Sequence, residues 1–207
     1  MINGPGTFIS VGMERLLQEG QCPEEVWPYN PNPVPGNEGQ DPPPTGAAQK
    51  AATFRIKETK RLPSRSVQDI RQVLADGAPV AFAVPVYTYW FSQPLRVTGD
   101  IRLPLANDHL EGGHAMTLVG YEDDPNVPGG GYFMVRNSWG TGWASQSSLG
   151  SGYARLPYAY IQYYGSAAHT AAAGPVQPEP IEPKPGDDKQ EGFFTKLLKF
   201  LRRLFSG

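Results

Sequence analysis

The spacing of apolar residues predicts two helices in the first half of the chain. The first begins at Asn3, a residue type that caps helices, and ends at Gly20, which suits a helix stop. The second is expected at residues 66–75, because Ser66 and Asp69 have the spacing of a capping box. The first half is therefore expected to be partly helical.

Compact apolar runs rich in Val, Tyr and Phe come next, and such runs are typical of strands. They predict four strands, at residues 79–86, 114–121, 132–137 and 152–156. Residues 28–44 contain seven prolines and are expected to form a loop with polyproline character. The chain thus combines helices with a set of strands.

The composition changes near residue 165. Residues 165–192 contain a run of alanines and five prolines, which predict a semi-extended linker that packs poorly. The folded domain is accordingly expected to occupy residues 1–164. Residues 193–207 are expected to form a cationic amphipathic helix. Its apolar arc contains Phe193, Phe194, Leu197, Leu198, Phe200, Leu201, Leu204 and Phe205. Its polar arc contains Thr195, Lys196, Lys199, Arg202 and Arg203.

Three surfaces could receive the helix expected at Phe193–Phe205. A basic face opposite bulky apolar residues is typical of helices that lie on a membrane surface. A helix that docks in the groove of a protein partner has a similar pattern. An amphipathic helix on a Pro-rich tether also resembles the encapsulation peptides of bacterial compartment cargo, so a protein shell is a candidate partner. The long tether argues against packing of the helix on its own domain.

Composition narrows the class of protein. A chain of 207 residues can form one sizeable domain. The net charge of −2 gives no field that would attract nucleic acid, so no nucleic-acid partner is expected. A single cysteine excludes an intrachain disulfide and fits a reducing compartment. There is no N-terminal signal and no run of about 18 apolar residues that could span a bilayer. We expect a cytoplasmic protein, either peripheral to a membrane or inside a protein assembly.

The candidate chemistry lies in residues 113–161. This stretch contains GHAMTLVGY, VRNSWGTGW and GYARLPYAYI, in that order. His114 suits a general base because an imidazole titrates near neutral pH, and Gly113 before it allows close approach of substrate. Asn137 can orient the ring by accepting its N–H, and Trp139 can shield that bond from water. Trp143 follows closely and is expected to support the site. The alternatives are a structural histidine at a strand start and an asparagine that forms a turn.

These three segments resemble those of the papain-like cysteine peptidases. The segment GQCPEEVWPYN, at residues 20–30, resembles the bacterial branch of that family. The resemblance covers residues 3–164 and implies a papain-like α+β fold. In that fold a helical half carries the catalytic cysteine, a twisted antiparallel β half carries the histidine and asparagine, and substrate binds between them. The chain would contain the β half and the end of the helical half.

The resemblance implies that His114 and Asn137 belong to a Cys–His–Asn catalytic set. The nucleophilic cysteine is then expected upstream of residue 1, in a segment that opens the central helix of the family. Two classes of function follow. The chain is either part of a peptidase that acts on peptides or proteins, completed by a Cys-bearing upstream fragment, or a non-catalytic papain-like binding module tethered by its C-terminal helix.

Other candidate residues carry weaker signals. Cys22 follows the first helix and precedes two glutamates, and nearby carboxylates disfavour a thiolate, so we expect a buried apolar role. Asp108, His109 and Glu111 could suggest a metal, but no second group of ligands accompanies them and a solvated loop is expected. His169 falls in the expected linker. No cofactor or metal is therefore expected.

Overall fold

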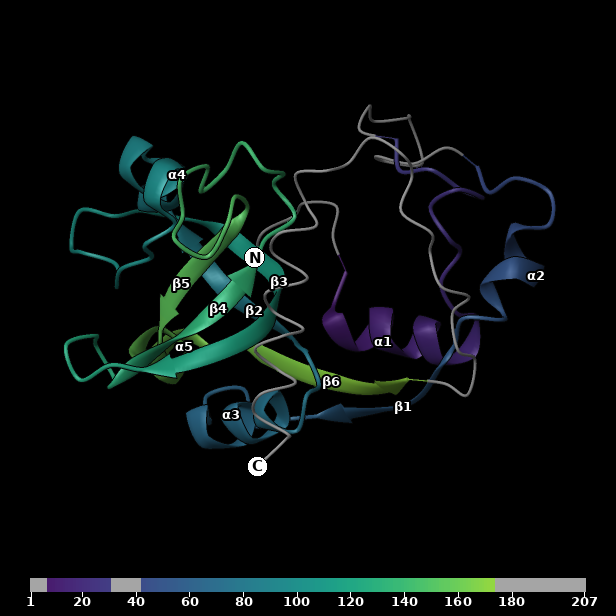
Figure 1. The fold of residues 1–207 in the computed structure, drawn as a ribbon, viewed down its shortest axis with the longest axis horizontal. Helices are drawn as coiled ribbons and strands as arrows, with labels where there is room; N and C mark the ends of the chain where they lie inside the picture. The colour runs from purple at the N-terminus through teal and green to yellow at the C-terminus, as the bar shows by residue number, and fades with distance from the viewer. Residues whose placement is uncertain (1–6, 31–41, 174–207) are drawn as a thin grey trace. The chain divides into compact units, whose positions relative to one another are not determined.

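A six-stranded antiparallel sheet organises the computed structural model, which describes residues 7–30 and 42–173 (Figure 1). The strands are β1 (Ile56–Arg61), β2 (Val80–Tyr87), β3 (Leu110–Asp123), β4 (Gly131–Arg136), β5 (Tyr153–Pro157) and β6 (Ala167–Ala173). They lie in the order β1-β6-β2-β3-β4-β5. The helices are α1 (Ile9–Gln18), α2 (Ala47–Ala51), α3 (Val67–Ala75), the 3-10 helix η1 (Thr88–Phe91), α4 (Gln93–Thr98) and α5 (Tyr158–Tyr164). The fold class is α+β, as predicted.

The predicted helices are present, with differences at their ends. The side chain of Ser66 accepts the Asp69 N–H at 3.2 Å and caps α3, so the capping-box spacing predicted the start of this helix. Helix α1 begins at Ile9, and the expected cap Asn3 lies outside the described residues. Gly20 follows α1 with a φ of 88°, a conformation that glycine adopts without strain.

Strand β2 shows why the apolar runs become strands. Its side chains alternate between buried and half-buried positions, and the buried set is Val80, Phe82, Val84 and Val86. The predicted strands 79–86, 132–137 and 152–156 match β2, β4 and β5 within about one residue. The strand predicted at 114–121 is longer than expected, since β3 begins at Leu110. His114 therefore lies inside a strand and not at its start.

One hydrophobic core joins the sheet to helices α3 and α5. Helices α3 and α5 pack on β2 to β4, while α1 lies alongside β1 and β6 (Figure 1). The largest fully buried side chains include Trp90, Tyr158, Tyr160, Phe82 and Phe133. Helix α1 contains no buried residue. Within the described residues, no helix is long and apolar enough to cross a bilayer.

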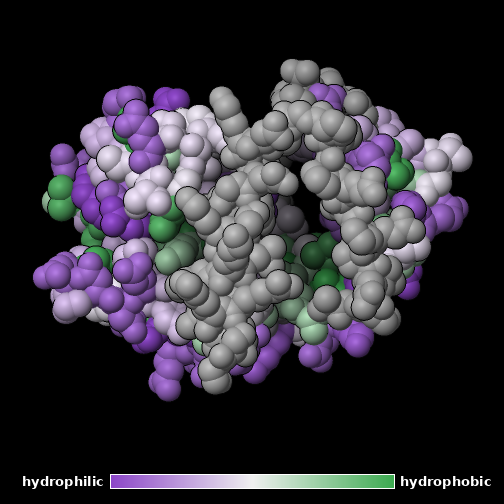
Figure 2. Space-filling model, in the orientation of Figure 1, coloured by the Kyte–Doolittle hydropathy of each residue, from purple (hydrophilic) through white to green (hydrophobic). Residues whose placement is uncertain are grey.

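On the face seen in Figure 2, the coloured residues are mainly hydrophilic, with separate hydrophobic patches. The exposed large apolar side chains are Phe8, Val11, Tyr29, Phe91, Leu105, Leu110, Val119 and Tyr163. Phe8 precedes α1 and Val11 lies within it, so part of the apolar surface of this helix is left uncovered.

The prediction of a linker from residue 165 is wrong for its first part, because residues 167–173 form the inner strand β6. This strand pairs with β1 on one side and with β2 on the other. Ala168 is completely buried, and its carbonyl accepts the N–H of Leu62 at 2.9 Å. Backbone hydrogen bonds to two neighbours hold the strand, so its weakly hydrophobic composition gave no signal. The remainder of the expected linker and the C-terminal helix lie outside the described residues.

His169 is also corrected, since it is a buried residue of β6 and not part of a linker. It is 7% exposed and lies opposite Arg61 of β1. Burial, together with the nearby Arg61 charge, lowers the pKa of this imidazole below its usual value. The neutral ring is thus a structural component of the sheet.

Truncation tests the place of β6. A chain of residues 1–173 should unfold at nearly the same urea midpoint as residues 1–207. A chain of residues 1–164 should lose more than about 3 kcal/mol of stability, because each buried backbone group left without its partner costs about 1–3 kcal/mol. Equal midpoints for the two truncations, measured by circular dichroism, would show that β6 is dispensable.

Candidate active site

Two neighbouring strands bring His114 and Asn137 together. His114 lies in β3 opposite Val84 of β2, and Asn137 directly follows the last residue of β4. Because Thr117 of β3 pairs with Arg136 of β4, both side chains reach the same end of the sheet. The distance between His114 Nε2 and Asn137 Oδ1 is 2.8 Å, which is a hydrogen bond.

A second donor determines how this hydrogen bond is directed. The backbone N–H of Ser138 donates to the same Asn137 oxygen at 2.8 Å. An atom that accepts this N–H must be the amide oxygen, so the His114 Nε2 carries the proton that it donates. In the neutral ring Nδ1 is then unprotonated. The arrangement presents Nδ1 as the atom that can accept a proton.

Aromatic rings cover the pair. The Trp139 ring stacks on His114 with centroids 4.7 Å apart and an angle of 23° between the planes. Trp143, which is 4% exposed, meets Trp139 edge-on at 5.6 Å. Rings in these positions exclude water from one side of the hydrogen bond and so strengthen it. The structure thus places Trp139 on the His114 ring and Trp143 against Trp139.

Gly113 opens space beside the histidine. It lies opposite Pro85 of β2. Apart from Gly113 itself and its two chain neighbours, no heavy atom of the described residues lies within 4 Å of the position that a Cβ would take. The glycine is therefore not required by packing within this chain. The free space therefore lies beside the backbone next to His114.

A hollow of about 480 Å³ lies next to Asn137. It is lined by Ala81, Ala115, Met116, Thr117, Arg136, Asn137 and Ser138, so much of its wall consists of small side chains. The Nδ2 atom of Asn137 is buried and has no hydrogen-bond partner among the described residues. This buried donor is therefore available to an acceptor that lies outside the described residues.

The structure keeps Cys22 apart from this site. Cys22 is 8% exposed and follows α1, and the N–H of neighbouring Gln21 donates to the Phe54 carbonyl, just before β1. Two strands, β6 and β2, lie between β1 and the β3 strand that carries His114. Cys22 is thus a small buried side chain near the edge of the sheet that β1 forms.

The prediction that Asp108, His109 and Glu111 lie in a solvated loop is wrong for Asp108. His109 and Glu111 are exposed, but the Asp108 side chain is 8% exposed and its Oδ2 lies 2.6 Å from Arg102 Nη1. The hydrogen bonds from Arg102 and from the Leu105 N–H hold the pKa of the Asp108 carboxyl below its usual value. In the described part of the chain, no group of three His, Cys, Asp or Glu side chains could hold a metal ion.

Sequence reasoning missed Arg102 and the contribution of Phe91 to the site. Phe91 stacks on Trp139 with centroids 5.4 Å apart. The sequence does contain a signal for the ion pair, because Arg102 stands six positions before Asp108. The sequence contains no signal that this pair lies close to Trp139, because that depends on the fold.

The fold and the site agree with the comparisons with known proteins. A family model described as "Papain family cysteine protease" matches residues 5–172, and the chain belongs to this family. The match includes β6, beyond the limit of residue 164 expected from the motifs. Xylellain, a cysteine protease from Xylella fastidiosa, has a solved structure that superposes with a TM-score of 0.67 at 30% identity. The aligned part covers 82% of this chain and 62% of that protein, and it confirms the papain-like fold.

Two further relatives are similar in sequence. A peptidase C1-like protein of Acanthamoeba polyphaga mimivirus is 27% identical over 159 residues, 75% of this chain and 48% of that protein. A cathepsin B-like protein of Giardia intestinalis is 28% identical over 139 residues, 62% of this chain and 40% of its own length. The chain thus spans about half, or less, of the curated relatives that it matches.

The hydrogen bond to Asn137 should be measurable in the chain itself. Replacing Asn137 with Ala removes the acceptor, so the His114 Nε2–H should exchange with water faster. The free energy of unfolding should fall by about 1 kcal/mol, the net contribution of one hydrogen bond. NMR of nitrogen-labelled histidine follows the exchange. Asn126→Ala is the control, because the hydrogen bonds that Asn126 makes within the described residues are to Asp124, in its own exposed turn. An exchange rate unaffected by Asn137→Ala would contradict the bond.

Proposed function

We propose that this chain supplies the general base and the orienting amide of a papain-type cysteine peptidase, and that the thiol comes from a segment outside residues 1–207. The observation that supports it is the His114–Asn137 hydrogen bond, which leaves Nδ1 as the basic ring nitrogen under the Trp139 ring. The substrates are peptides or proteins, and the reaction is hydrolysis of the peptide bond.

The proposed chemistry follows from that tautomer. The thiol transfers its proton to His114 Nδ1, and the thiolate attacks the peptide carbonyl carbon. The imidazolium then gives the proton to the leaving amine, and an acyl-enzyme remains. Water, deprotonated by the same nitrogen, hydrolyses the thioester and releases the thiol. Asn137 keeps the ring oriented and stays neutral, so the imidazolium pairs with the thiolate and not with a second anion.

The hollow next to Asn137 is where we propose that the thiol-bearing segment packs. Small side chains such as Ala81 and Ala115 let another backbone approach the sheet closely. The uncovered apolar residues Phe8 and Val11 at α1 offer further area to bury. The greater length of the relatives is consistent with this addition. An acceptor from the added segment would also satisfy the buried Asn137 Nδ2.

We assign the chain to the bacterial branch of the family. The segment GQCPEEVWPYN at residues 20–30 and the 30% identity to the Xylella protein support this assignment.

A non-catalytic papain-like module that binds peptides is the competing proposal, and turnover separates the two. Residues 1–207 alone should not hydrolyse a general cysteine-peptidase substrate through a thiol. Fusion to the amino-terminal part of the Xylella protease, where the family pattern predicts the cysteine, should give turnover. In that fusion His114→Ala should lower kcat/KM by roughly 10²–10⁴-fold, the range for loss of a general base. Asn137→Ala should be less damaging, because the amide only orients the ring.

His109→Ala serves as the control, since His109 is an exposed histidine on the loop before β3. Two results would count against the proposal. Turnover by residues 1–207 that disappears with Cys22→Ala would make Cys22 the nucleophile. A folded fusion that binds peptides without cleaving them would favour the binding module.

We also propose that the segment 193–205, which lies outside the described residues, attaches the protein reversibly to an anionic membrane surface. The segregation of eight apolar residues from four basic ones supports it. Burial of each Leu or Phe contributes roughly 1.5–3 kcal/mol, partly offset by the cost of ordering the chain. Each cation near anionic lipid adds about 1 kcal/mol.

Liposome flotation tests the membrane proposal. Residues 1–207 should float with vesicles that contain phosphatidylserine, and flotation should weaken as salt is raised, because salt screens the four cations. Residues 1–192 should not float. A variant with all four cations replaced by Gln is the matched control for charge, and its binding should lose the dependence on salt. Failure to float, together with capture of the tail by a protein, would assign the helix to partner docking.

A further inference from the structure

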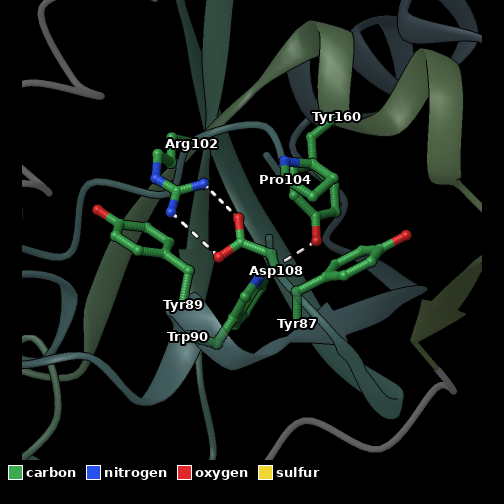
Figure 3. A pocket seen from close by; sticks show the side chains of 7 residues that line it. All are labelled: Tyr87, Tyr89, Trp90, Arg102, Pro104, Asp108 and Tyr160. Carbon is green, nitrogen blue, oxygen red and sulfur yellow. Dashed lines mark hydrogen bonds and ion pairs between the residues drawn. The ribbon is translucent and has the colours of Figure 1, made fainter. Parts of the chain in front are cut away.

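An ion pair closes the loop that leads into β3 (Figure 3). Arg102 Nη1 lies 2.6 Å from Asp108 Oδ2, and Arg102 Nη2 lies 3.2 Å from Asp108 Oδ1. Two parallel hydrogen bonds between a guanidinium and a carboxylate fix both distance and orientation. The Asp108 side chain is 8% exposed and that of Arg102 is 34% exposed, so water competes little for the carboxylate. The pair is thus more rigid than a surface salt bridge.

The same two side chains bind their own loop. The Leu105 N–H donates to Asp108 Oδ2 at 2.7 Å, and Arg102 Nη1 donates to the Leu103 carbonyl at 2.9 Å. The Arg102 guanidinium also lies over the Tyr89 ring, 3.7 Å from its centroid. Since Tyr89 belongs to η1, the ion pair connects the loop to that helix.

Backbone bonds complete the connection between η1 and the loop. The Thr88 N–H donates to the His109 carbonyl at 2.9 Å, and the His109 N–H donates to Thr88 Oγ1 at 3.2 Å. The Tyr89 hydroxyl donates to the Asp100 carbonyl at 3.3 Å. The loop and η1 therefore form one unit, which Arg102 and Asp108 hold together at its centre.

This unit supplies rings that hold Trp139 in place. Phe91 of η1 stacks on Trp139 with centroids 5.4 Å apart and an angle of 24°. Trp90 of η1 meets Trp139 edge-on at 6.3 Å, and its Nε1–H donates to the Tyr160 hydroxyl at 3.2 Å. Trp139 in turn stacks on His114. A continuous set of contacts thus runs from the ion pair to the histidine ring.

We propose that Arg102 and Asp108 are positioning residues for the active site: their ion pair fixes η1, and η1 keeps Trp139 on the His114–Asn137 hydrogen bond. The catalytic consequence rests on the proposed role of His114 as the base. The positioning itself is a property of this chain and can be measured without any peptidase activity.

The test uses residues 1–207 and NMR of the His114 ring. Asp108→Asn keeps the shape and an acceptor for Leu105 but removes the charge, and Arg102→Gln removes the planar fork. Both should speed exchange of the His114 Nε2–H by roughly tenfold or more, because exchange follows local opening of the site. Both should also move the His114 ring-proton shifts toward their positions in a Trp139→Ala variant. Arg102→Lys, which keeps the charge without the fork, should be intermediate.

Asp123→Asn is the matched control. This substitution removes the Arg71–Asp123 ion pair, whose N–O distance of 2.6 Å equals that of the Arg102–Asp108 pair. The Arg71 guanidinium lies over the rings of Tyr121 and Tyr158 and not over Tyr89. This control should leave the His114 exchange rate and shifts unchanged, even where it lowers stability. If Asp108→Asn and Asp123→Asn changed the His114 exchange rate and shifts equally, the Arg102–Asp108 pair would contribute only to general stability. That result would overturn the proposal. Unchanged His114 signals in folded Asp108→Asn or Arg102→Lys would overturn it as well.

Peptidase measurements on the fusion give an independent outcome. An inactive fusion in which the NMR effects are present would count against the proposed function while the positioning stands. An active fusion without the NMR effects would support the proposed function and overturn the positioning role of Arg102 and Asp108.

Discussion

The antiparallel pairing of β3 with β2 and β4 is the constraint on which the site depends. His114 comes from the middle strand, and Asn137 follows the strand beside it. A shift of one residue in either register would turn a side chain to the other face of the sheet and separate the two. The alternating burial of β2 prevents that shift, because Val80, Phe82 and Val84 must all face the core. The packing of the core thus sets the geometry of the hydrogen bond.

In the peptidase that we propose, an amide at position 137 has an electrostatic advantage over a carboxylate. A carboxylate would orient the ring equally well, but it would pair with the imidazolium and leave a thiolate without its counter-charge. An amide oxygen that is already held by the Ser138 N–H orients the ring and adds no charge. The Trp139 ring over the pair removes water that would compete for the same oxygen. Three consecutive residues, Asn137, Ser138 and Trp139, therefore orient the His114 ring, add no charge beside it and keep water away from it. This is why they form one compact sequence motif.

Sequence reasoning was accurate where a local pattern decides the structure. The cap of α3 at Ser66, the stop at Gly20 and the strand β2 each depend on neighbouring residues, and each is confirmed. The juxtaposition of His114 with Asn137 came from motifs. The errors lie where contacts between segments that are distant in the sequence determine the structure. Strand β6 is alanine-rich and is held by backbone bonds to β1 and β2, which no local pattern shows.

Asp108 illustrates the same limit inside the site region. In the sequence it is one of several acidic and polar residues before β3, and such a segment usually faces water. In the structure its carboxylate is enclosed by Arg102 and by the rings of Tyr87, Tyr89, Trp90 and Tyr160 (Figure 3). Those rings come from the end of β2, from η1 and from α5, so the enclosure exists only after the sheet has formed. The surroundings of His114 therefore depend on tertiary contacts, although the motif that contains it can be read from the chain alone. Under the proposed positioning role of Arg102 and Asp108, a loop outside the motif tunes the site while the motif itself stays unchanged.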